Sequence, residues 1–194
     1  MKGFIVRNAY FNAEQLEYQV SSIKRELENL GVEVDVIYNG YDCYIDENAN
    51  VVCPYKDYDF CVYLDKDKYL GAMLEKQGLK IFNSPRSIEI CDDKLLTVLA
   101  LSGNGVKVPK TFSAPLCFTK NAKISEESVQ KIIDELSLPL IAKKSFSSLG
   151  KGVFLIDSKQ ELIDFINQNP FEPKIYQEFI SSSYGRDIRI ICIG

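Results

Sequence analysis

Two lysines close an apolar run in the last third of the chain, and a loop of small residues follows them. The run covers residues 138–142, Lys143 and Lys144 end it, and the loop at 145–152 returns into a second apolar run at 153–156. A lysine at the end of a buried strand must be paired or face a cavity, because an uncompensated buried ammonium is costly. Main-chain amides in a loop with few bulky side chains can donate to phosphate oxygens. The segment therefore predicts a strand–loop–strand unit that binds a polyphosphate.

The two lysines are expected to have different surroundings. Alternation along a strand places Lys143 and Lys144 on opposite faces, so one of them should face the site. Lys144 is expected to extend to solvent, and the same solvent exposure is the alternative for Lys143. The loop residues expected to contact phosphate are Ser147, Ser148 and Gly150, for which an ordinary β-hairpin turn is the alternative.

The loop does not match the P-loop of nucleoside triphosphatases. That pattern, G-x-x-x-x-G-K-[ST], would need glycine where Ser145 stands and serine or threonine where Gly152 stands. A strand rather than a helix is predicted to follow the loop. We therefore expect a mobile lid that becomes ordered over bound phosphates.

A further lysine, Lys94, lies in a helix predicted for residues 84–103. Ser84 caps this helix, and Pro85 occupies its first turn, where a missing N–H costs nothing. Lys94 follows two acidic residues, Asp92 and Asp93. On spacing alone, Lys94 would lie on a solvated helix surface.

A polar strand is predicted near residues 175–180, and an edge strand leaving the sheet is the alternative interpretation of it. Asp187 and Arg189 follow and alternate onto the same face of the chain. A structural ion pair between these two residues is as good an interpretation as a role in binding.

Taken together, Asp93-Lys94, the lid and Gln177-Glu178-Phe179-Ile180 resemble the ATP-grasp ligases, most closely the RimK-like branch of ribosomal-protein glutamate ligases. The connector Val108-Pro109-Lys110-Thr111 also fits that family, and the resemblance covers nearly all of the chain. It implies an α/β fold, in which a Rossmann-like, parallel-sheet pre-ATP-grasp domain precedes the first part of an ATP-grasp domain. We place these domains at residues 1–84 and 85–194.

The resemblance also implies roles for individual residues. Lys94 and Lys143 would bind the nucleotide phosphates, and Asp187 would accept from the ribose hydroxyls. Arg189 is the implied catalytic residue and would meet phosphate or an acyl-phosphate intermediate. The remaining implied nucleotide contacts come from the lid and from a hinge strand. The main chain of the hinge strand would pair with adenine, and Ile141 would lie against the adenine ring. These contacts are Ser147, Ser148, Gly150, Gln177, Glu178, Phe179 and Ile180.

The implied activity is ATP-dependent ligation of a carboxylate to an amine, both from small molecules or peptides. ATP would phosphorylate the carboxylate, and the amine would displace phosphate. The family's Mg²⁺ ligands correspond to positions beyond Gly194, so we expect no metal ligand in this chain. We expect an N-terminal fragment that is inactive alone. A complete, non-catalytic nucleotide- or partner-binding module is the alternative, favoured if residues 188–193 are covered. Ligases of this kind are commonly homo-oligomers.

The bulk composition limits the other classes of function. The chain has 194 residues, a net charge of -4, six cysteines and no histidine. There is no basic footprint for nucleic acid, no apolar run long enough to span a bilayer, and no signal-peptide pattern. The absence of histidine and of C-x-x-C pairs excludes the usual zinc sites and Ser-His or Cys-His chemistry. We expect reduced thiols and a cytoplasmic protein.

The first half alternates strands and helices, which indicates crossover units and a largely parallel sheet without a G-x-G-x-x-G fingerprint. The predicted strands are 3–7, 32–38, 59–64 and 80–82, and a hairpin is expected to pair 43–45 with 51–53. A capping box at Asn12 should start a helix that ends at Gly31. The second half predicts helices at 126–136 and after Ser158, and a final strand at 188–193.

Overall fold

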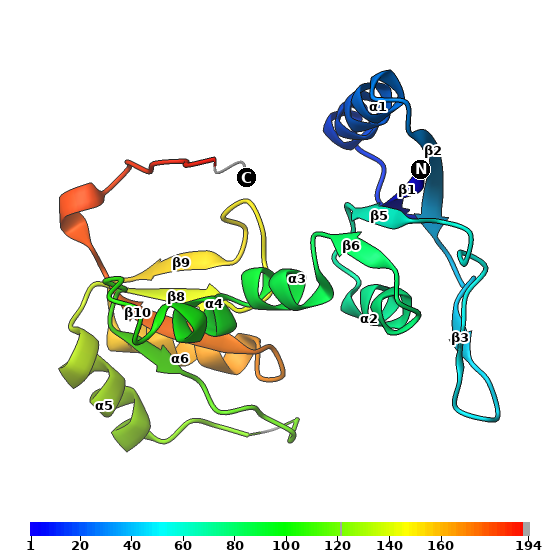
Figure 1. Cartoon of the computed structure of the whole chain (residues 1–194). Coiled ribbons are helices and arrows are strands. Elements are labelled where there is room, and N and C mark those ends of the chain that lie inside the picture. Colours follow the sequence, from blue (N-terminus) through cyan, green and yellow to red (C-terminus); the bar gives the residue numbers. More distant parts are fainter. Residues whose placement is uncertain (121, 192–194) are drawn as a thin grey trace. The chain divides into compact units, whose positions relative to one another are not determined.

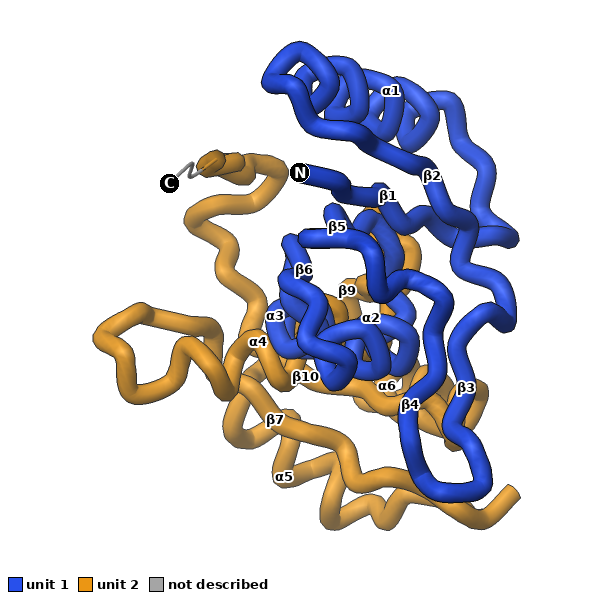
Figure 2. The backbone as a smooth tube through the Cα atoms, turned by 45° about the vertical axis from the view of Figure 1, so that its right-hand side comes forward, with its two compact units in different colours: residues 1–91 blue, residues 92–194 orange. Residues whose placement is uncertain are grey.

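The computed structural model of the chain describes residues 1–120 and 122–191, which belong to two compact units (Figures 1 and 2). Unit 1 is Met1–Cys91, and unit 2 begins at Asp92. The sequence-based boundary near residue 84 lies at one end of helix α3 (Pro85–Asp92), and the boundary between the units lies at the other end.

Unit 1 is built on a four-stranded parallel sheet, as predicted. Its strand order is β2-β1-β5-β6. The strands are β1 (Lys2–Asn8), β2 (Glu33–Asn39), β5 (Phe60–Tyr63) and β6 (Lys80–Phe82), and the helices between them are α1 (Glu14–Asn29) and α2 (Lys68–Lys76).

Successive residues of β1 enter two separate cores, one on each face of the sheet. Ile5 packs with Val20 of α1, whereas Phe4 and Val6 pack with Leu74 of α2. Such three-layer packing is typical of doubly wound α/β folds. The predicted Rossmann-like architecture is confirmed.

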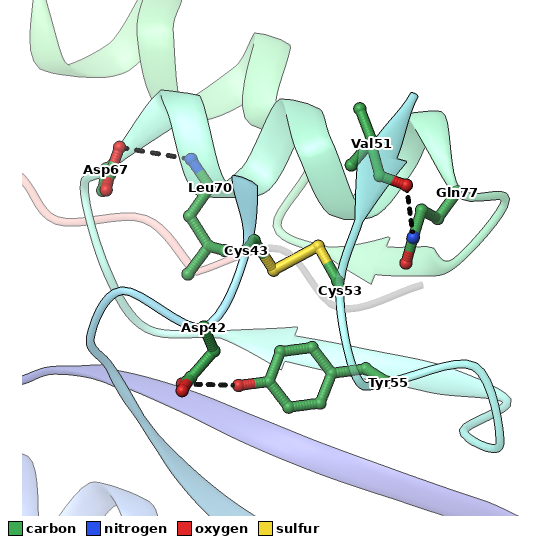
Figure 3. The surroundings of a disulfide bond; sticks show 8 residues. All are labelled: Asp42, Cys43, Val51, Cys53, Tyr55, Asp67, Leu70 and Gln77. Atoms are coloured by element: carbon green, nitrogen blue, oxygen red, sulfur yellow. Dashed lines mark hydrogen bonds between the residues drawn. A yellow bond between two sulfur atoms is a disulfide. The ribbon is translucent and has the colours of Figure 1, made fainter. Parts of the chain in front are cut away.

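The predicted hairpin forms from β3 (Tyr44–Ile45) and β4 (Val51–Val52). Its register pairs Tyr44 with Val52, so Cys43 and Cys53 stand opposite one another, with their Cα atoms 4.4 Å apart. This spacing allows the disulfide that the structure contains (Figure 3). The expectation of reduced thiols is therefore wrong for this pair, while Cys61, Cys91 and Cys117 are free.

The predicted capping box at Asn12 does not form. The N-cap of α1 is Ala13, and no side chain caps that position. Asn12 Oδ1 instead accepts from the Arg7 guanidinium, whose other arm pairs with Glu17. The buried Arg7 guanidinium must be paired with oxygens of the protein, such as those of Asn12 and Glu17. The amides at the exposed start of α1 can bind water instead.

Unit 2 contains a four-stranded sheet in the order β7-β10-β8-β9, with antiparallel pairs throughout. The strands are β7 (Thr111–Ser113), β8 (Leu140–Lys144), β9 (Val153–Ile156) and β10 (Lys174–Glu178). Helices α5 (Glu126–Leu136) and α6 (Lys159–Gln168) begin at the caps Ser125 and Ser158 and share one core with the sheet. In Figure 1, both helices lie on the same side of this sheet.

The single helix predicted for residues 84–103 is instead two helices, α3 and α4 (Lys94–Leu101). Asp93 separates them, because its Oδ1 accepts from the amides of Leu95 and Leu96 at 2.8 and 3.3 Å. An aspartate is among the strongest N-cap residues and starts a new helix here. The interruption places Lys94 at the first helical position of α4.

The segment after β10 contains a short 3₁₀ turn, η1 (Ser181–Ser183), and then continues without regular structure. The strand predicted at 188–193 is absent from its described part, residues 188–191; the remaining two positions lie outside the described residues. Ile188 is 89% exposed, since no neighbouring strand pairs with this segment in the described chain. Among the described residues, no helix has the length and apolar composition needed to cross a membrane.

Candidate functional site

Lys143 and Gln177 meet on the face of the unit 2 sheet that α5 and α6 do not cover. In the register, Lys143 stands beside Ile175 and Ile141 beside Gln177, whereas Ala142 and Tyr176 enter the helical core. Lys143 Nζ donates to Gln177 Oε1 at 2.5 Å. The structure thus places two of the predicted nucleotide contacts side by side.

The Gln177 side chain also connects the site to strand β7. It is 4% exposed, and its Nε2 donates to Thr111 Oγ1 at 2.8 Å. Thr111 in turn donates to the carbonyl oxygen of Pro109 at 2.7 Å. The sequence indicated Thr111 only as part of the family-like connector 108–111. Its pairing with Gln177 follows from the register of β7 and β10, and the strand β7 was not predicted.

Lys94 is bound to the lid. Its main-chain amide donates to Ser145 O at 3.2 Å. Its ammonium donates to Ser147 O at 2.7 Å, to Ser147 Oγ at 2.8 Å and to Ser145 O at 3.3 Å. The solvated-surface interpretation of Lys94 is therefore wrong, and Ser145, 2% exposed, is a contact that the sequence did not indicate.

The two ammonium groups influence one another. The pKa of Lys143 is lowered, first by burial and second by the positive charge of Lys94. Two neighbouring cations, one of them half-buried, make a site that favours an anion, because an anion would relieve both the repulsion and the loss of hydration. Lys144, on the other face of β8, pairs with Glu172 at 2.7 Å, so the predicted alternation is confirmed.

The lid, residues 145–152, turns through a left-handed region. Leu149 and Gly150 have φ of 56° and 75°, and the Leu149 side chain is exposed. Gly152 approaches the rest of the lid closely: a Cβ there would lie 2.4 Å from Ser147 Oγ. Ser148 and Gly150 lie at the exposed end of the lid. The main chain here is consequently accessible to a ligand.

The hinge strand is an interior strand, since β10 lies between β7 and β8, and the edge-strand alternative is wrong. Glu178 is already engaged at both ends by Lys110: its N–H donates to Lys110 O at 3.1 Å, and its carboxylate accepts from Lys110 N at 2.8 Å. Beyond it, Phe179 lies half-buried with its ring edge-on to Tyr184, and Ile180 is exposed.

Asp187 and Arg189 are both exposed and are not brought to the lysines. Among the described residues, neither side chain forms an ion pair or hydrogen bond with Lys94, Lys143 or with the other. Their structural ion pair is therefore not formed. No cluster of three or more potential metal ligands occurs in residues 1–120 and 122–191.

Comparison with known proteins places both units in one class, the ATP-grasp fold. The D-alanine–D-alanine ligase of Bacillus anthracis aligns over 93% of this chain and 57% of its own, with a TM-score of 0.67 and 19% identity. A RimK-like ATP-grasp domain matches residues 91–194. The chain belongs to the RimK-like ATP-grasp family.

Two relatives show the extent of the match. β-Citrylglutamate synthase B of Mus musculus is 35% identical over 137 residues, which are 69% of this chain and 33% of that protein. Coenzyme γ-F420-2:α-L-glutamate ligase of Methanocaldococcus jannaschii is 27% identical over 97% of this chain and 67% of its own. The chain therefore spans about a third of the length of the first of these relatives.

Proposed function

We propose that this chain is the nucleotide-binding part of an ATP-dependent carboxylate–amine ligase. The observation that carries the proposal is the proximity of two cations, Lys94 and Lys143, beside a lid rich in serine and glycine. Family membership supports the same conclusion, and the two relatives described above are a β-citrylglutamate synthase and a glutamate ligase.

ATP would bind with its phosphates between the two lysines. Lys143 would keep one donor on Gln177 and offer the others to phosphate oxygens, which satisfies an ammonium that burial leaves poorly solvated. Lys94 would give up its hydrogen bonds to the Ser147 oxygens and donate to phosphate oxygens instead. Binding of the nucleotide would thus release the lid from Lys94. Because the Glu178 N–H is engaged by Lys110, adenine would pair with the main chain of Phe179 and Ile180.

The proposed reaction has two steps. A carboxylate oxygen attacks the γ-phosphorus, and the bond to the β-phosphate oxygen breaks, giving ADP and an acyl phosphate. The amine nitrogen then attacks the acyl carbon, and inorganic phosphate leaves. Mg²⁺, expected for the family, would supply charge stabilisation. The roles of Asp187 on ribose and Arg189 on the acyl phosphate stay predictions.

The test is nucleotide titration with a matched pair of variants. Lys143→Met should weaken ADP and pyrophosphate binding about 10-fold or more, a loss of roughly 1.4 kcal/mol. Lys144→Met removes the same charge from the other face of the same strand and should leave affinity within about twofold. AMP, which lacks the outer phosphates, should be much less sensitive to Lys143→Met. Equal losses in both variants would contradict the proposal.

The alternative, a complete binding module without catalysis, required a covered segment at 188–193. Ile188, Ile190 and Ile191 are 89%, 79% and 79% exposed, so no observation favours that alternative. That the chain alone is inactive stays a prediction, and ADP release on addition of carboxylate and amine would contradict it. Cytoplasmic location and a homo-oligomeric state likewise stay predictions.

A further inference from the structure

Unit 1 contains a cavity of about 340 Å³ at the carboxyl edge of its parallel sheet. Asn8 ends β1, Asn39 ends β2, and both line this cavity. Strand β2 lies on one side of β1, and β5, which follows later in the chain, lies on the other side. The strand order therefore reverses between β1 and β5. Ligands of open α/β sheets bind in the crevice at this point, and the volume suits a small molecule.

The walls of the cavity carry negative charge and no positive charge. Its lining residues include two carboxylates, Asp42 and Asp67, two asparagine amides and three tyrosines, but no lysine or arginine. The helix end that often binds anions at such an edge is closed, because Asp67 Oδ1 accepts from the amides of Tyr69 and Leu70 (Figure 3 shows the bond to Leu70). A phosphate or carboxylate ligand is therefore disfavoured.

Hydrogen bonds fix the orientation of the two asparagines. Asp65, 7% exposed, accepts from Asn8 Nδ2 and, at 2.9 Å, from Asn39 Nδ2. The second Asn39 hydrogen goes to Asp67 Oδ2 at 3.0 Å. Since both Asn39 hydrogens point to carboxylates, its Oδ1 is fixed as an acceptor, and no described residue donates to it.

The hairpin side of the cavity also presents an acceptor. Tyr55 donates from its hydroxyl to Asp42 Oδ2 at 2.9 Å, and Figure 3 shows this pair beside the Cys43–Cys53 disulfide. Burial and the Asp42 charge both raise the pKa of Tyr55, which keeps its proton on the phenol. Asp42 Oδ1 accepts no hydrogen bond from the described residues, so it is available to a ligand.

Aromatic rings and apolar side chains complete the walls. The hydroxyls of Tyr10 and Tyr41 lie 3.1 Å apart and join the loops that follow β1 and β2. Leu70 and Met73 of α2 line the cavity as well. Ring faces attract organic cations, and a short apolar body can contact the α2 side chains.

We propose that this cavity binds a small organic ammonium compound. The ammonium donates to Asn39 Oδ1 and Asp42 Oδ1, and its hydrocarbon part lies against Leu70, Met73 and the tyrosine rings. All of these residues belong to unit 1, so the site does not depend on nucleotide binding by unit 2.

The test compares three probes of one size: n-butylamine, n-butanol and butyrate. Each is titrated into the whole chain, and the side-chain NH₂ resonances of Asn8 and Asn39 are followed by NMR. The amine should give saturable shifts with an affinity at least about 10-fold above that of the alcohol, because only the amine carries a positive charge that the carboxylates of the cavity attract. Butyrate should give no saturable shift. Equal affinities for the three probes, or no saturation by the amine, would overturn the proposal.

Two variants localise the effect. Asp42→Asn keeps an acceptor for Tyr55 but removes the charge, and should weaken amine binding at least about fivefold. Glu47→Gln, an exposed change of the same charge in the same hairpin, should leave it unchanged. Tyr41→Ala alters a side chain that is 94% exposed, so folding is preserved. This variant should weaken amine binding by a smaller factor than Asp42→Asn does. If Glu47→Gln weakened binding as much as Asp42→Asn, binding would reflect net charge and not this cavity.

Discussion

The Lys94 ammonium lies 2.7 Å from the main-chain carbonyl oxygen of Ser147, a residue 53 positions further along the chain. This contact joins the start of α4 to the lid, and two further bonds from the same ammonium strengthen it. The lid therefore has a specific anchor, and the anchor is one of the two lysines proposed to bind phosphate.

Lys94→Met should loosen the lid. The change removes charge-assisted hydrogen bonds, each worth about 1.5–3 kcal/mol, while keeping a side chain of similar length. Amides of residues 147–152 should exchange with deuterium about 10-fold faster or more. Lys151→Met, which removes a charge from the lid itself, is the control and should have little effect. Unchanged exchange in Lys94→Met would show that the lid is held by other contacts.

The Lys143 ammonium should respond to pH in a defined direction. Its pKa is lowered in the folded chain, so between that pKa and the ordinary lysine value the unfolded chain binds more protons than the folded chain. Stability should therefore rise with pH across this window. Denaturant unfolding at a series of pH values should show the rise in the wild type and a smaller one in Lys143→Met. Lys144→Met should retain it.

Pyrophosphate should raise the pKa of Lys143, because a bound anion stabilises the charged form. The titration can be followed through the ¹³Cε resonance of this lysine, with and without pyrophosphate. The resonance of Lys144, which already pairs with Glu172, serves as the internal control and should not respond to pyrophosphate. A Lys143 midpoint that does not move at saturating pyrophosphate would place the anion elsewhere.

Gly152→Ala should disturb the lid through a steric clash. The added Cβ would lie 2.4 and 2.6 Å from the Oγ and Cβ atoms of Ser147, and overpacking of this kind costs about 1–3 kcal/mol. Ser147→Gly removes both atoms, so the double variant should be more stable than the sum of the two single changes predicts. Denaturant unfolding measures this coupling. Additive effects would mean that the clash is relieved elsewhere.

Asp93→Ala should destabilise the start of α4, since Asp93 Oδ1 accepts from two amides of the first turn. The expected loss of unfolding free energy is about 0.5–2 kcal/mol, whereas Asp93→Ser retains a capping oxygen and should lose much less. Nucleotide affinity should fall in the alanine variant as well, because Lys94 is positioned by that turn. If Asp93→Ala lost stability but kept full nucleotide affinity, capping of α4 by Asp93 would not be needed to position Lys94.

Local chemistry was sufficient to predict many of the elements. Helix α5 forms at the predicted residues 126–136, α6 begins after Ser158 as expected, and the alternation of Lys143 and Lys144 holds, because helix patterns and strand faces depend on near neighbours. The sequence did not predict the division at Asp93 or the loss of the Asn12 cap. In both cases two short-range hydrogen-bonding arrangements competed: Asp93 caps the amides of Leu95 and Leu96, and the Asn12 oxygen accepts from the Arg7 guanidinium.

The candidate site was predictable in its cations and less so in their partners. Lys94 and Lys143 were identified by family resemblance, but their contacts with Ser145 and Gln177 depend on strand order and register, which one sequence does not give. The hairpin that pairs residues 43–45 with 51–53 was expected, but the Cys43–Cys53 bond within it was not, because the thiols were expected to be reduced. Arg189 lies in a segment that pairs with no strand of the described residues, and its predicted role stays untested.

The Gln177 side-chain amide is the centre of a hydrogen-bond relay across three strands, in which the donor of each bond is fixed. Lys143 can only donate, so the amide oxygen must face it, and the amide hydrogens must face Thr111, which passes its own hydrogen to Pro109. If phosphate draws Lys143 away, the oxygen of a side chain that is almost fully enclosed loses its donor. That cost favours an ammonium that stays on Gln177, so an anion bound by its other hydrogens would meet a lysine held in place by a relay that ends at the proline connector before β7.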